Sequence, residues 1–509
     1  MAVRFQRWIA VLLAVCCLAT AAELRAAPSG AVFKAGFAER DITPELGMEV
    51  PGGYGKAYAR TIHDPCKVRA AVFDDGRSRV ALVSVDGGFI FRGVVQAARQ
   101  AIYEQCGIRP EAVLIGATHS HSAGPLGMVQ PGQYDDAAPL VRTLAYEKSS
   151  CADAKYLEHV RRQIVAAVCQ ADQGRATSRC GLGKGIEDKV AFNRRQRMKN
   201  GLTYTHAGQG NPDILGYAGP ADPEVGVLGS WDGAGKLQGA IVNFACHATT
   251  NPGGISANYI YYLEQTIRGS FGPQAIVLFF PGDSGDVTQV DNLSPYANPP
   301  GERWAQIVGG RVGAEAVKVL LSMERGPLAP VDARSKLLRI ARRVPRPDRV
   351  RQCLELVKKE PKEVGATEWA FAKEIVLLDA LLAHSPRAEV EVQAIQVGAA
   401  VFLASPGELF CEYQLQQKAR SPFPMTFCVS VANDFVGYVP TDEALGPHGG
   451  GYETRLTSVS NLEVGAGRRI VETALELARQ MTPGTLPVPA KAPPFRQPWP
   501  YGDVSAELQ

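Results

Sequence analysis

The feature that most constrains the fold is a repeated transition from a short apolar run to a polar, glycine-rich turn. Runs of β-branched and aliphatic residues end abruptly in this way at 80–85, 113–115, 240–245, 275–280, 394–403 and 427–431. Stretches with helical apolar spacing lie between many of these runs. The alternation is typical of an α/β or α+β domain with a mixed sheet core and flanking helices. Because ligands of open α/β sheets bind beyond the carboxyl ends of strands, we expect the polar ends to share one cleft.

Helices are predicted from apolar spacing and helix-favouring composition over 94–105, 154–170, 304–323, 348–359, 367–383 and 470–480. The charged stretch 339–363 is interpreted as a solvated helical insertion. The proline-rich stretch 483–500 cannot hold a regular helix or a central strand. No internal sequence repeat is found.

The first 27 residues have the pattern of a secretory signal peptide, with basic residues, an apolar run over 8–22 and small residues at the end. That run is too short to span a bilayer, and no later segment reaches about 18 apolar residues, so a membrane-embedded enzyme is disfavoured. We therefore expect a secreted or periplasmic protein with a signal peptide (1–27), one catalytic domain (28–482) and a tail (483–509).

The charge distribution argues against nucleic acid as a partner. The chain is 46% hydrophobic and 21% charged, as in a soluble globular protein, and its net charge of +3 is spread among both signs. The composition leaves the oligomeric state open.

The cysteines allow two interpretations. The chain has 11 cysteines, and nine remain once Cys16 and Cys17 of the signal peptide are removed. The group Cys151, Cys169 and Cys180 lies close enough in sequence to include a disulfide in an oxidising compartment. The alternative is that most of the nine are buried free thiols. No CxxC spacing supports a zinc site built from cysteines.

Two histidines follow the second apolar run, in the sequence Thr118-His119-Ser120-His121. If this segment is extended, both side chains point the same way, because side chains alternate along a strand. The two histidines would then face one site, although a structural, hydrogen-bonded role is the alternative for each.

A further histidine and a carboxylate follow two later runs. His247 lies in Asn-Phe-Ala-Cys-His-Ala-Thr-Thr (243–250), and Glu408 lies in Ser-Pro-Gly-Glu-Leu-Phe (405–410). Glu408 could instead stabilise a helix N-terminus. Two imidazoles and one carboxylate are, however, the ligand set of a catalytic zinc ion, which keeps one position for water.

These segments resemble motifs of the neutral ceramidase family. The sequence ATHSHSAGP resembles the family's first histidine motif, NFACHATT its second, SPGELF its glutamate segment, and NDFVGYVPT with the later GGYE its tyrosine segment. The matches occur in family order. Together with AGFAERDITP (35–44) and IHDP (62–65), they extend over nearly the whole mature chain.

The resemblance implies a zinc-dependent amidohydrolase that converts ceramide to sphingosine and a fatty acid. It implies zinc ligands at His119, His247, Glu408 and Tyr438. The substrate would be a small-molecule or lipid amide.

The resemblance also implies roles for other residues. Tyr438 would stabilise the oxyanion, and His121 or Asp286 would handle the proton passed to the leaving amine. Arg194 lies in a segment that resembles an arginine segment lining the family's site, with a surface charge as the alternative. Asp86 and Tyr54 are further candidates near strand ends and turns.

The chain departs from the family pattern in two places. Where ceramidases carry Gly-Asp-Val-Ser-Pro-Asn with a functional serine, residues 285–290 read Gly-Asp-Val-Thr-Gln-Val, so Thr288 replaces that serine. The chain also ends soon after the tyrosine segment, so no carboxy-terminal β-sandwich domain is expected.

The sequence argues against two other classes of hydrolase and leaves two alternatives open. The sequence Gly-Asp-Ser-Gly at 282–285 is found around the nucleophile of trypsin-like proteases, but Asp286-Val287 replace the Gly-Pro that should follow, and no upstream Ala-Ala-His-Cys occurs. No Gly-x-Ser-x-Gly elbow is present. A zinc hydrolase of a different amide or ester, and a non-catalytic zinc-binding relative, remain as alternatives.

Overall fold

The structure is a computed structural model that describes residues 32–50, 52–502 and 505–506. The predicted signal peptide (1–27) lies outside the described residues. Within the described part of the chain, residues 482–499 form neither helix nor strand. The predicted domain limits and the expected lack of a β-sandwich domain stay predictions.

Three of the sheets share one topology, in which three antiparallel strands are followed by a fourth strand parallel to the third. The strand orders are β4-β3-β2-β1-β5, β13-β12-β11-β6 and β19-β17-β16-β15, the short β5 being an addition to the first sheet. The first sheet comprises β1 (Lys34–Asp41), β2 (Lys67–Asp74), β3 (Arg79–Val85), β4 (Val113–Ala117) and β5 (Ala176–Thr177). The second comprises β6 (Arg179–Ile186), β11 (Glu224–Trp231), β12 (Leu237–Phe244) and β13 (Ile276–Pro281). The third comprises β15 (Val331–Ala341), β16 (Arg387–Val397), β17 (Ala400–Ala404) and β19 (Met425–Val429).

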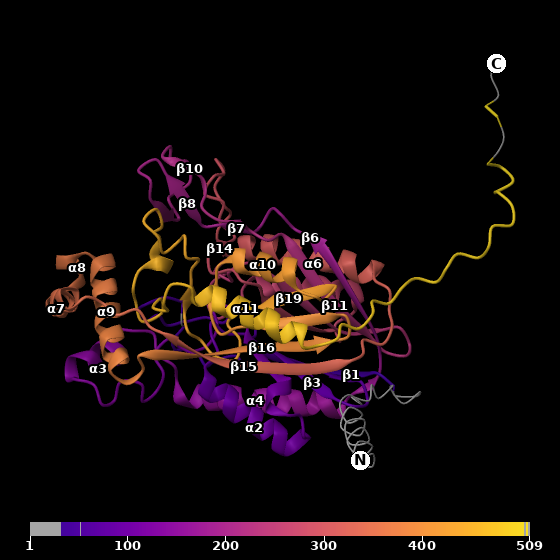
Figure 1. Ribbon diagram of the computed structural model, residues 1–509, viewed down its shortest axis with the longest axis horizontal. Coiled ribbons are helices and arrows are strands. Elements are labelled where there is room, and N and C mark those ends of the chain that lie inside the picture. Colours follow the sequence, from indigo (N-terminus) through magenta and orange to yellow (C-terminus); the bar gives the residue numbers. More distant parts are fainter. Residues whose placement is uncertain (1–31, 51, 503–504, 507–509) are drawn as a thin grey trace, which may run out of the picture. The chain divides into compact units, whose positions relative to one another are not determined.

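The helices repeat with the sheets. A crossover helix links the third and fourth strands of each sheet: α2 (Arg92–Cys106), α5 (Tyr259–Phe271) and α10 (Cys411–Arg420). A second helix follows each fourth strand and packs beside the crossover helix: α4 (Ala154–Gln173), α6 (Gly301–Ser322) and α11 (Ala466–Arg479). The order β-β-β-α-β-α therefore occurs three times (Figure 1). We call these three units the repeats, and they are topological, since the sequence shows no such repeat.

One core is shared by all three sheets. It joins side chains from the inward faces of the first, second and third sheets, among them Phe73, Leu82, Ile241, Phe280, Phe402 and Phe427. The opposite faces of the second and third sheets pack against their own helix pairs. Strands buried on both faces are apolar at every position, which explains the continuous runs in the sequence.

Strand direction brings the carboxyl ends of three strands in each repeat to the same edge of their sheet. The third and fourth strands of each repeat end at the same edge, because they are parallel. The first strand, antiparallel to the second, also ends there. The connections from first to second strand, residues 42–66, 187–223 and 342–386, therefore start and finish at the edge that carries the polar strand ends.

Further elements lie in these connections and in the other loops of the chain. They comprise η1 (Pro110–Ala112), α3 (Pro139–Tyr146), β7 (Phe192–Asn193), β8 (Arg195–Met198), β9 (Thr203–Thr205), β10 (Ile214–Tyr217), β14 (Val287–Thr288), α7 (Pro347–Leu356), α8 (Pro361–Val364), α9 (Ala366–His384), β18 (Glu408–Leu409), β20 (Tyr438–Val439) and η2 (Tyr452–Thr454). Two-stranded pairs join β14 to β7 and β18 to β20, and β8 lies between β9 and β10.

The α/β prediction is confirmed, but two local predictions were wrong. The run 394–403 is not one strand: β16 and β17 form a tight hairpin through Gly398, whose φ of 60° favours glycine. The stretch 339–363 is only partly helical, because residues 339–341 complete β15 before α7 and α8 begin. Cys353 on α7 is fully buried, so this segment packs against its surroundings and is not wholly solvated.

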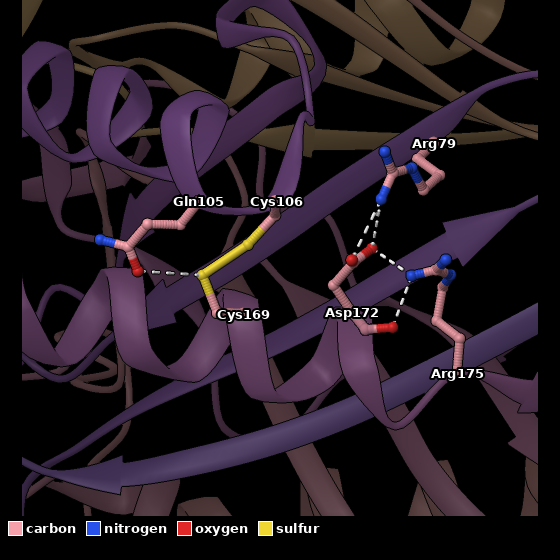
Figure 2. The surroundings of a disulfide bond; sticks show 6 residues. All are labelled: Arg79, Gln105, Cys106, Cys169, Asp172 and Arg175. Carbon is pink, nitrogen blue, oxygen red and sulfur yellow. Dashed lines mark hydrogen bonds and ion pairs between the residues drawn. A yellow bond between two sulfur atoms is a disulfide. The ribbon is translucent and has the colours of Figure 1, made fainter.

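A disulfide joins the two helices that cover the first sheet. Cys106 at the end of α2 pairs with Cys169 on α4, with their Cα atoms 6.0 Å apart (Figure 2). Cys151 and Cys180 are free thiols, so a bridge within the group Cys151, Cys169 and Cys180 was a wrong prediction. Most of the other described cysteines are buried free thiols, as the alternative interpretation held.

Candidate metal centre

Three histidines from two repeats lie together at the shared edge. The Nε2 atoms of His119 and His121 are 3.4 Å apart, and the His247 ring centroid lies 4.6 Å from that of His119. The ligand atoms of the three residues all lie within 4.8 Å of one another. His119 has a φ of 63°, so the segment is not extended and strand alternation is not what brings His119 and His121 together.

A carboxylate from the third repeat completes the cluster. Glu408, in β18, places Oε2 3.3 Å from Nε2 of His119 and 3.1 Å from Nε2 of His247. A tetrahedral zinc ion with bonds of about 2.0–2.1 Å holds neighbouring ligand atoms about 3.3–3.4 Å apart. The observed spacings match that polyhedron. We call His119, His121, His247 and Glu408 the candidate metal centre.

The outer hydrogen bonds of the histidines orient their rings. Nδ1 of His119 lies 2.8 Å from the Gly88 carbonyl, and Nδ1 of His247 lies 2.7 Å from the Ser284 carbonyl. Nδ1 of His121 lies 3.3 Å from the Gly52 carbonyl. Because a carbonyl only accepts, each Nδ1 carries the proton and each Nε2 keeps a lone pair. Metal-binding histidines are oriented in the same way.

The protonation states suit a cation. Burial lowers the pKa of His247 far below its usual value and, together with His119, lowers the pKa of His121 to about 4. Burial acts to raise the pKa of Glu408, but the neighbouring histidines outweigh it, and that pKa lies well below its usual value. His121 and His247 therefore favour the neutral form, and Glu408 favours the carboxylate.

This arrangement leaves buried polar atoms without donors. Nε2 of His247 and Oε2 of Glu408 have no hydrogen-bond partner in the described part of the chain. Lone pairs that face each other at 3.1 Å in a buried site are unfavourable unless a cation lies between them. The donor set and its geometry therefore fit a bound metal ion.

Tyr438 lies beside the centre on β20. It pairs in parallel register with Glu408 of β18, and both residues line one cavity with His121. Its hydroxyl lies 2.9 Å from the Tyr452 hydroxyl and accepts a hydrogen bond of 3.2 Å from Arg194. Burial raises the pKa of Tyr438 well above its usual value, so the phenol is neutral. Its role as a metal ligand stays a prediction.

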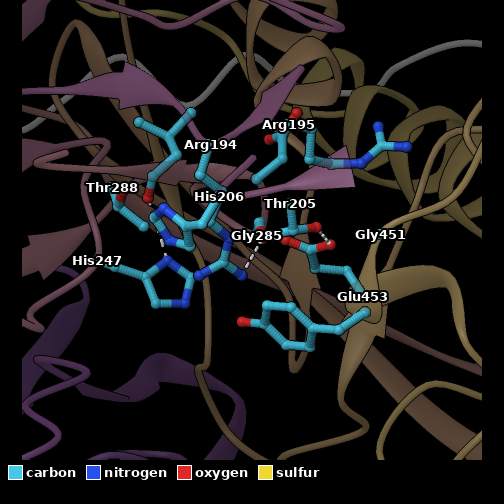
Figure 3. Close-up of polar contacts among 12 residues, drawn as sticks. Arg194, Arg195, Thr205, His206, His247, Gly285, Thr288, Gly451 and Glu453 are labelled. Atoms are coloured by element: carbon cyan, nitrogen blue, oxygen red, sulfur yellow. Dashed lines mark hydrogen bonds and ion pairs between the residues drawn. The ribbon is translucent and has the colours of Figure 1, made fainter. Parts of the chain in front are cut away.

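Arg194 is a buried residue of this site and not a surface charge. It follows β7, which β14 pairs and holds in place. Its Nε donates to Glu453 at 2.7 Å, and Nη2 donates to the Gly285 carbonyl at 2.7 Å (Figure 3). The guanidinium also lies 5.0 Å from the centre of the Tyr452 ring. Arg194 is thus fixed with one nitrogen directed at Tyr438.

Thr288 lies on β14, close to His247 and His206 (Figure 3). Its side chain is 2% exposed, and its hydroxyl accepts a hydrogen bond from the backbone of Val290 at 3.3 Å. No hydrogen bond joins this hydroxyl to the candidate metal centre among the described residues. A functional role for the Thr288 hydroxyl stays a prediction.

Asp286 is not brought together with the histidines. Its two carboxylate oxygens accept hydrogen bonds from the Cys411 backbone at 2.8 Å and from Asn193 at 2.7 Å. Burial raises its pKa to about 6. These contacts tie β7 to the start of α10, and a role for Asp286 in proton transfer stays a prediction. Asp86 likewise binds Arg69, at 2.9 Å, within the first sheet.

A cavity of about 220 Å³ opens beside the centre. It is walled mainly by Tyr54, Phe89, Met128, Phe435, Tyr438, Tyr452 and Val459, with His121 and Glu408 at one side. We call it the aromatic cavity. Sequence reasoning did not single out Phe89, Phe435, Tyr452, Glu453 or His206, which no motif chemistry marks in isolation. The GGYE match was the one signal that pointed to Tyr452 and Glu453.

Comparison with known proteins gives a consistent result. No family model matches the chain. A neutral ceramidase of Pseudomonas aeruginosa is 26% identical over 352 residues, which cover 65% of this chain and 48% of that protein. The chain therefore spans about half the length of that relative. A crystal structure of neutral ceramidase from Pseudomonas aeruginosa superposes with a TM-score of 0.67 at 20% identity, covering 91% of this chain and 77% of that one.

The chain is a relative of the neutral ceramidases. A structure described as a ceramidase complexed with C2 superposes similarly, with a TM-score of 0.66 at 19% identity over 91% of this chain and 78% of that chain. The neutral ceramidase fold thus extends over the three repeats, and the family resemblance predicted from the sequence is confirmed. Among the described residues, no helix combines the length and apolarity needed to cross a membrane.

Proposed function

We propose that the chain is an exported, zinc-dependent hydrolase that cleaves the N-acyl amide bond of ceramide or of a closely similar lipid amide. The observation that carries the proposal is that Oε2 of Glu408 lies 3.3 Å from Nε2 of His119 and 3.1 Å from Nε2 of His247, in a relative of the neutral ceramidases. Support for lipid binding comes from the aromatic cavity beside these atoms.

His119, His247 and Glu408 would hold the zinc ion. Two residues compete for the fourth position. Tyr438 is favoured by its register with Glu408, and His121 is favoured by its Nε2 atom, 3.4 Å from that of His119. When bound, zinc would polarise the scissile carbonyl and lower the pKa of a water molecule.

The protein's own groups would supply orientation and charge stabilisation. Arg194 donates to Tyr438, and Tyr438 contacts Tyr452, so two phenols are held by one buried cation at the wall of the aromatic cavity. Such fixed donors stabilise an oxyanion when they are aimed at the position it will occupy. His121 would take or deliver a proton through Nε2, because its Nδ1 faces Gly52.

The first experiment measures zinc content and the hydrolysis of a fluorescent ceramide. We expect the wild type to hold one zinc ion per chain and to cleave the substrate, and His119→Ala to lose both. His159→Ala, on α4, is the matched control and should keep both. Absence of zinc from the wild type would overturn the assignment of the centre.

Two further variants refine the proposal. Thr288→Ser restores the hydroxyl type of the family motif, and higher activity in it would assign Thr288 to substrate contact. Bound zinc without cleavage in either form would favour the alternatives, a zinc hydrolase of another amide or ester or a non-catalytic relative. Export is tested by amino-terminal sequencing of protein recovered outside the cytoplasm, which should begin near residue 28.

A further inference from the structure

A second cavity, of about 470 Å³, lies next to the aromatic cavity. The two share four lining residues, Tyr54, Met128, Phe435 and Val459. A substrate that has its amide at the metal centre therefore has space beyond these four side chains. We call the second space the arginine cavity, after Arg92, Arg342 and Arg387 in its lining.

The carboxylates of the arginine cavity already have partners. Glu389 forms an ion pair with Arg92 at 3.0 Å, and Glu374 forms one with Lys373 at 3.1 Å. Asp434 accepts hydrogen bonds from two backbone N–H groups, and burial raises its pKa to about 6. The negative charge of the lining is thus largely compensated.

Arg342 is the exception among the charged residues. Its Nε donates to the Ser385 carbonyl at 3.1 Å, and Nη1 donates to the Asn461 side chain at 2.6 Å. Nη2 makes no hydrogen bond, and no carboxylate lies within 4.0 Å of the guanidinium in the described part of the chain. Burial lowers its pKa, while Tyr134 and the carboxylate of Asp434, which lies beyond ion-pair distance, act to raise it. A guanidinium fixed by two neutral acceptors keeps its remaining donors for a ligand.

A second cation strengthens the positive character of this cavity. Arg387 lies at the exposed start of β16 and, among the described residues, forms no ion pair. Two unpaired arginines against compensated carboxylates favour an anionic ligand. An uncharged amide such as ceramide would leave the partly buried guanidinium of Arg342 with Asp434 as a longer-range counter-charge only and with no anion bonded to Nη2.

We propose that Arg342 binds an anionic group, a phosphate or a carboxylate, carried by the substrate on one side of its amide bond. This inference rests on the proposed amidohydrolase function and adds that, among lipid amides, the site prefers those that carry an anionic group. Arg342 binds the ligand through Nη2, while Ser385 and Asn461 hold its other nitrogens. Arg387 contributes at the rim.

The test compares matched neutral and anionic substrates. One pair is ceramide and ceramide 1-phosphate, and the other is N-dodecanoylethanolamine and N-dodecanoylglycine, so that phosphate and carboxylate are distinguished. We expect kcat/KM of the zinc-loaded wild type to favour the anionic member of at least one pair by about tenfold or more. Arg342→Gln should remove this preference without changing kcat/KM for the neutral member by more than about twofold, and Arg342→Lys should retain part of it.

The control is Arg339→Gln, an exposed arginine three residues earlier that does not line the cavity. It should keep the wild-type preference, and the melting temperature of each variant shows that the fold is intact. A wild-type preference for both neutral members, or the same preference in Arg342→Gln as in the wild type, would overturn the proposal.

Binding measurements separate this proposal from the proposed function. If no substrate is cleaved, the amidohydrolase proposal fails, and calorimetry then compares sphingosine 1-phosphate with sphingosine. Tighter binding of the phosphate by the wild type, lost in Arg342→Gln, would support the anion site on its own. Equal binding of the two ligands, or an unchanged difference in the variant, would refute it.

Discussion

At the scale of single residues, charges buried at the strand ends dominate the site. Glu408 faces two imidazole lone pairs, and this contact is stable only when a cation lies among them. Asp283 is also buried and, among the described residues, forms no ion pair within 4.0 Å, although Lys418 acts on it from farther away. Substitutions at Glu408 and at Asp283 test the two kinds of buried carboxylate separately.

Glu408→Gln should reverse the order of stability with and without zinc. Without zinc, glutamine can donate an N–H to His119 or His247, so the melting temperature of the variant should exceed that of the wild type. With excess zinc the wild type should be the more stable, because the variant has lost the ligand charge. Glu412→Gln, in the first turn of α10, is the control and should show no reversal. A variant less stable than the wild type in both states would contradict the lone-pair argument.

Asp283 should make stability depend on pH. It is 1% exposed, and burial raises its pKa to about 7. Between about pH 4 and pH 7 the folded chain holds a proton that the unfolded chain releases, so the free energy of unfolding falls as pH rises and then levels off. Asp283→Asn keeps the hydrogen bond from Gln417. Because asparagine does not ionise, the free energy of unfolding of the variant does not fall in this way as pH rises.

The advantage of Asp283→Asn should therefore grow from pH 4 to pH 7, reaching on the order of 3 kcal/mol. Urea unfolding at several pH values measures it. Asp188→Asn, at an exposed carboxylate, should show no such growth. A difference that is constant with pH would contradict the burial argument for Asp283.

The sequence was sufficient to place some site residues and insufficient for others. His119, His247 and Glu408 could be found because each directly follows an apolar run, where strands end. His206 and Phe435 could not, because they enter the site through loops that only tertiary packing fixes. The contact between His119 and His121 was predicted for the wrong reason, since it depends on a positive φ that no residue pattern announces.

At the scale of elements, the two helices of the second repeat pack closely against each other. Gly309 and Gly313 of α6 lie against α5, where an added Cβ at Gly309 would come within 2.1 Å of the Tyr259 carbonyl. Gly310, the next residue, has open space around its Cβ position. Close packing against α5 therefore requires glycine at position 309, whereas nothing in the packing requires it at position 310.

Alanine substitutions at these two positions should have opposite effects. Gly310→Ala should raise the free energy of unfolding by about 0.5–1 kcal/mol, because alanine is the better helix former. Gly309→Ala should lower it by about 1–3 kcal/mol, since backbone must move to admit the methyl group. Denaturant unfolding of the two variants provides the measurement. Equal effects would mean that α5 and α6 do not pack as described.

The elements that the sequence missed have physical explanations. The sequence of the β16–β17 hairpin has the pattern of one continuous strand, because both strands are buried on both faces and the turn needs only Gly398 and Ala399. Helix α5 is rich in tyrosine and isoleucine, which lack strong helix propensity. Tertiary packing decided both cases.

At the scale of the whole molecule, the centre joins the three repeats. His119 follows the fourth strand of the first repeat, His247 the third strand of the second, and Glu408 the third strand of the third. No repeat alone contains the ligand set. A bound ion therefore links sheets whose other contacts are chiefly apolar.

Removal of the metal should destabilise all three repeats together. With free zinc at a thousand times its dissociation constant, binding adds about 4 kcal/mol to the free energy of unfolding. We expect chelation to lower the melting temperature and to speed amide hydrogen exchange at the ends of β4, β12 and β17. Faster exchange in one repeat alone would show that the ion does not join the sheets.

The proposed metal ligands and the residues of the connections between first and second strands come from different parts of the chain. The ligands follow third and fourth strands, whereas Tyr54, Arg194 and Arg342 belong to the three separate connections 42–66, 187–223 and 342–386. The proposed metal ligands and these three surrounding residues are thus encoded in different stretches of the gene. Mutation can lengthen, shorten or recharge one connection while the ligands stay in place, so related proteins could acquire new substrates one connection at a time.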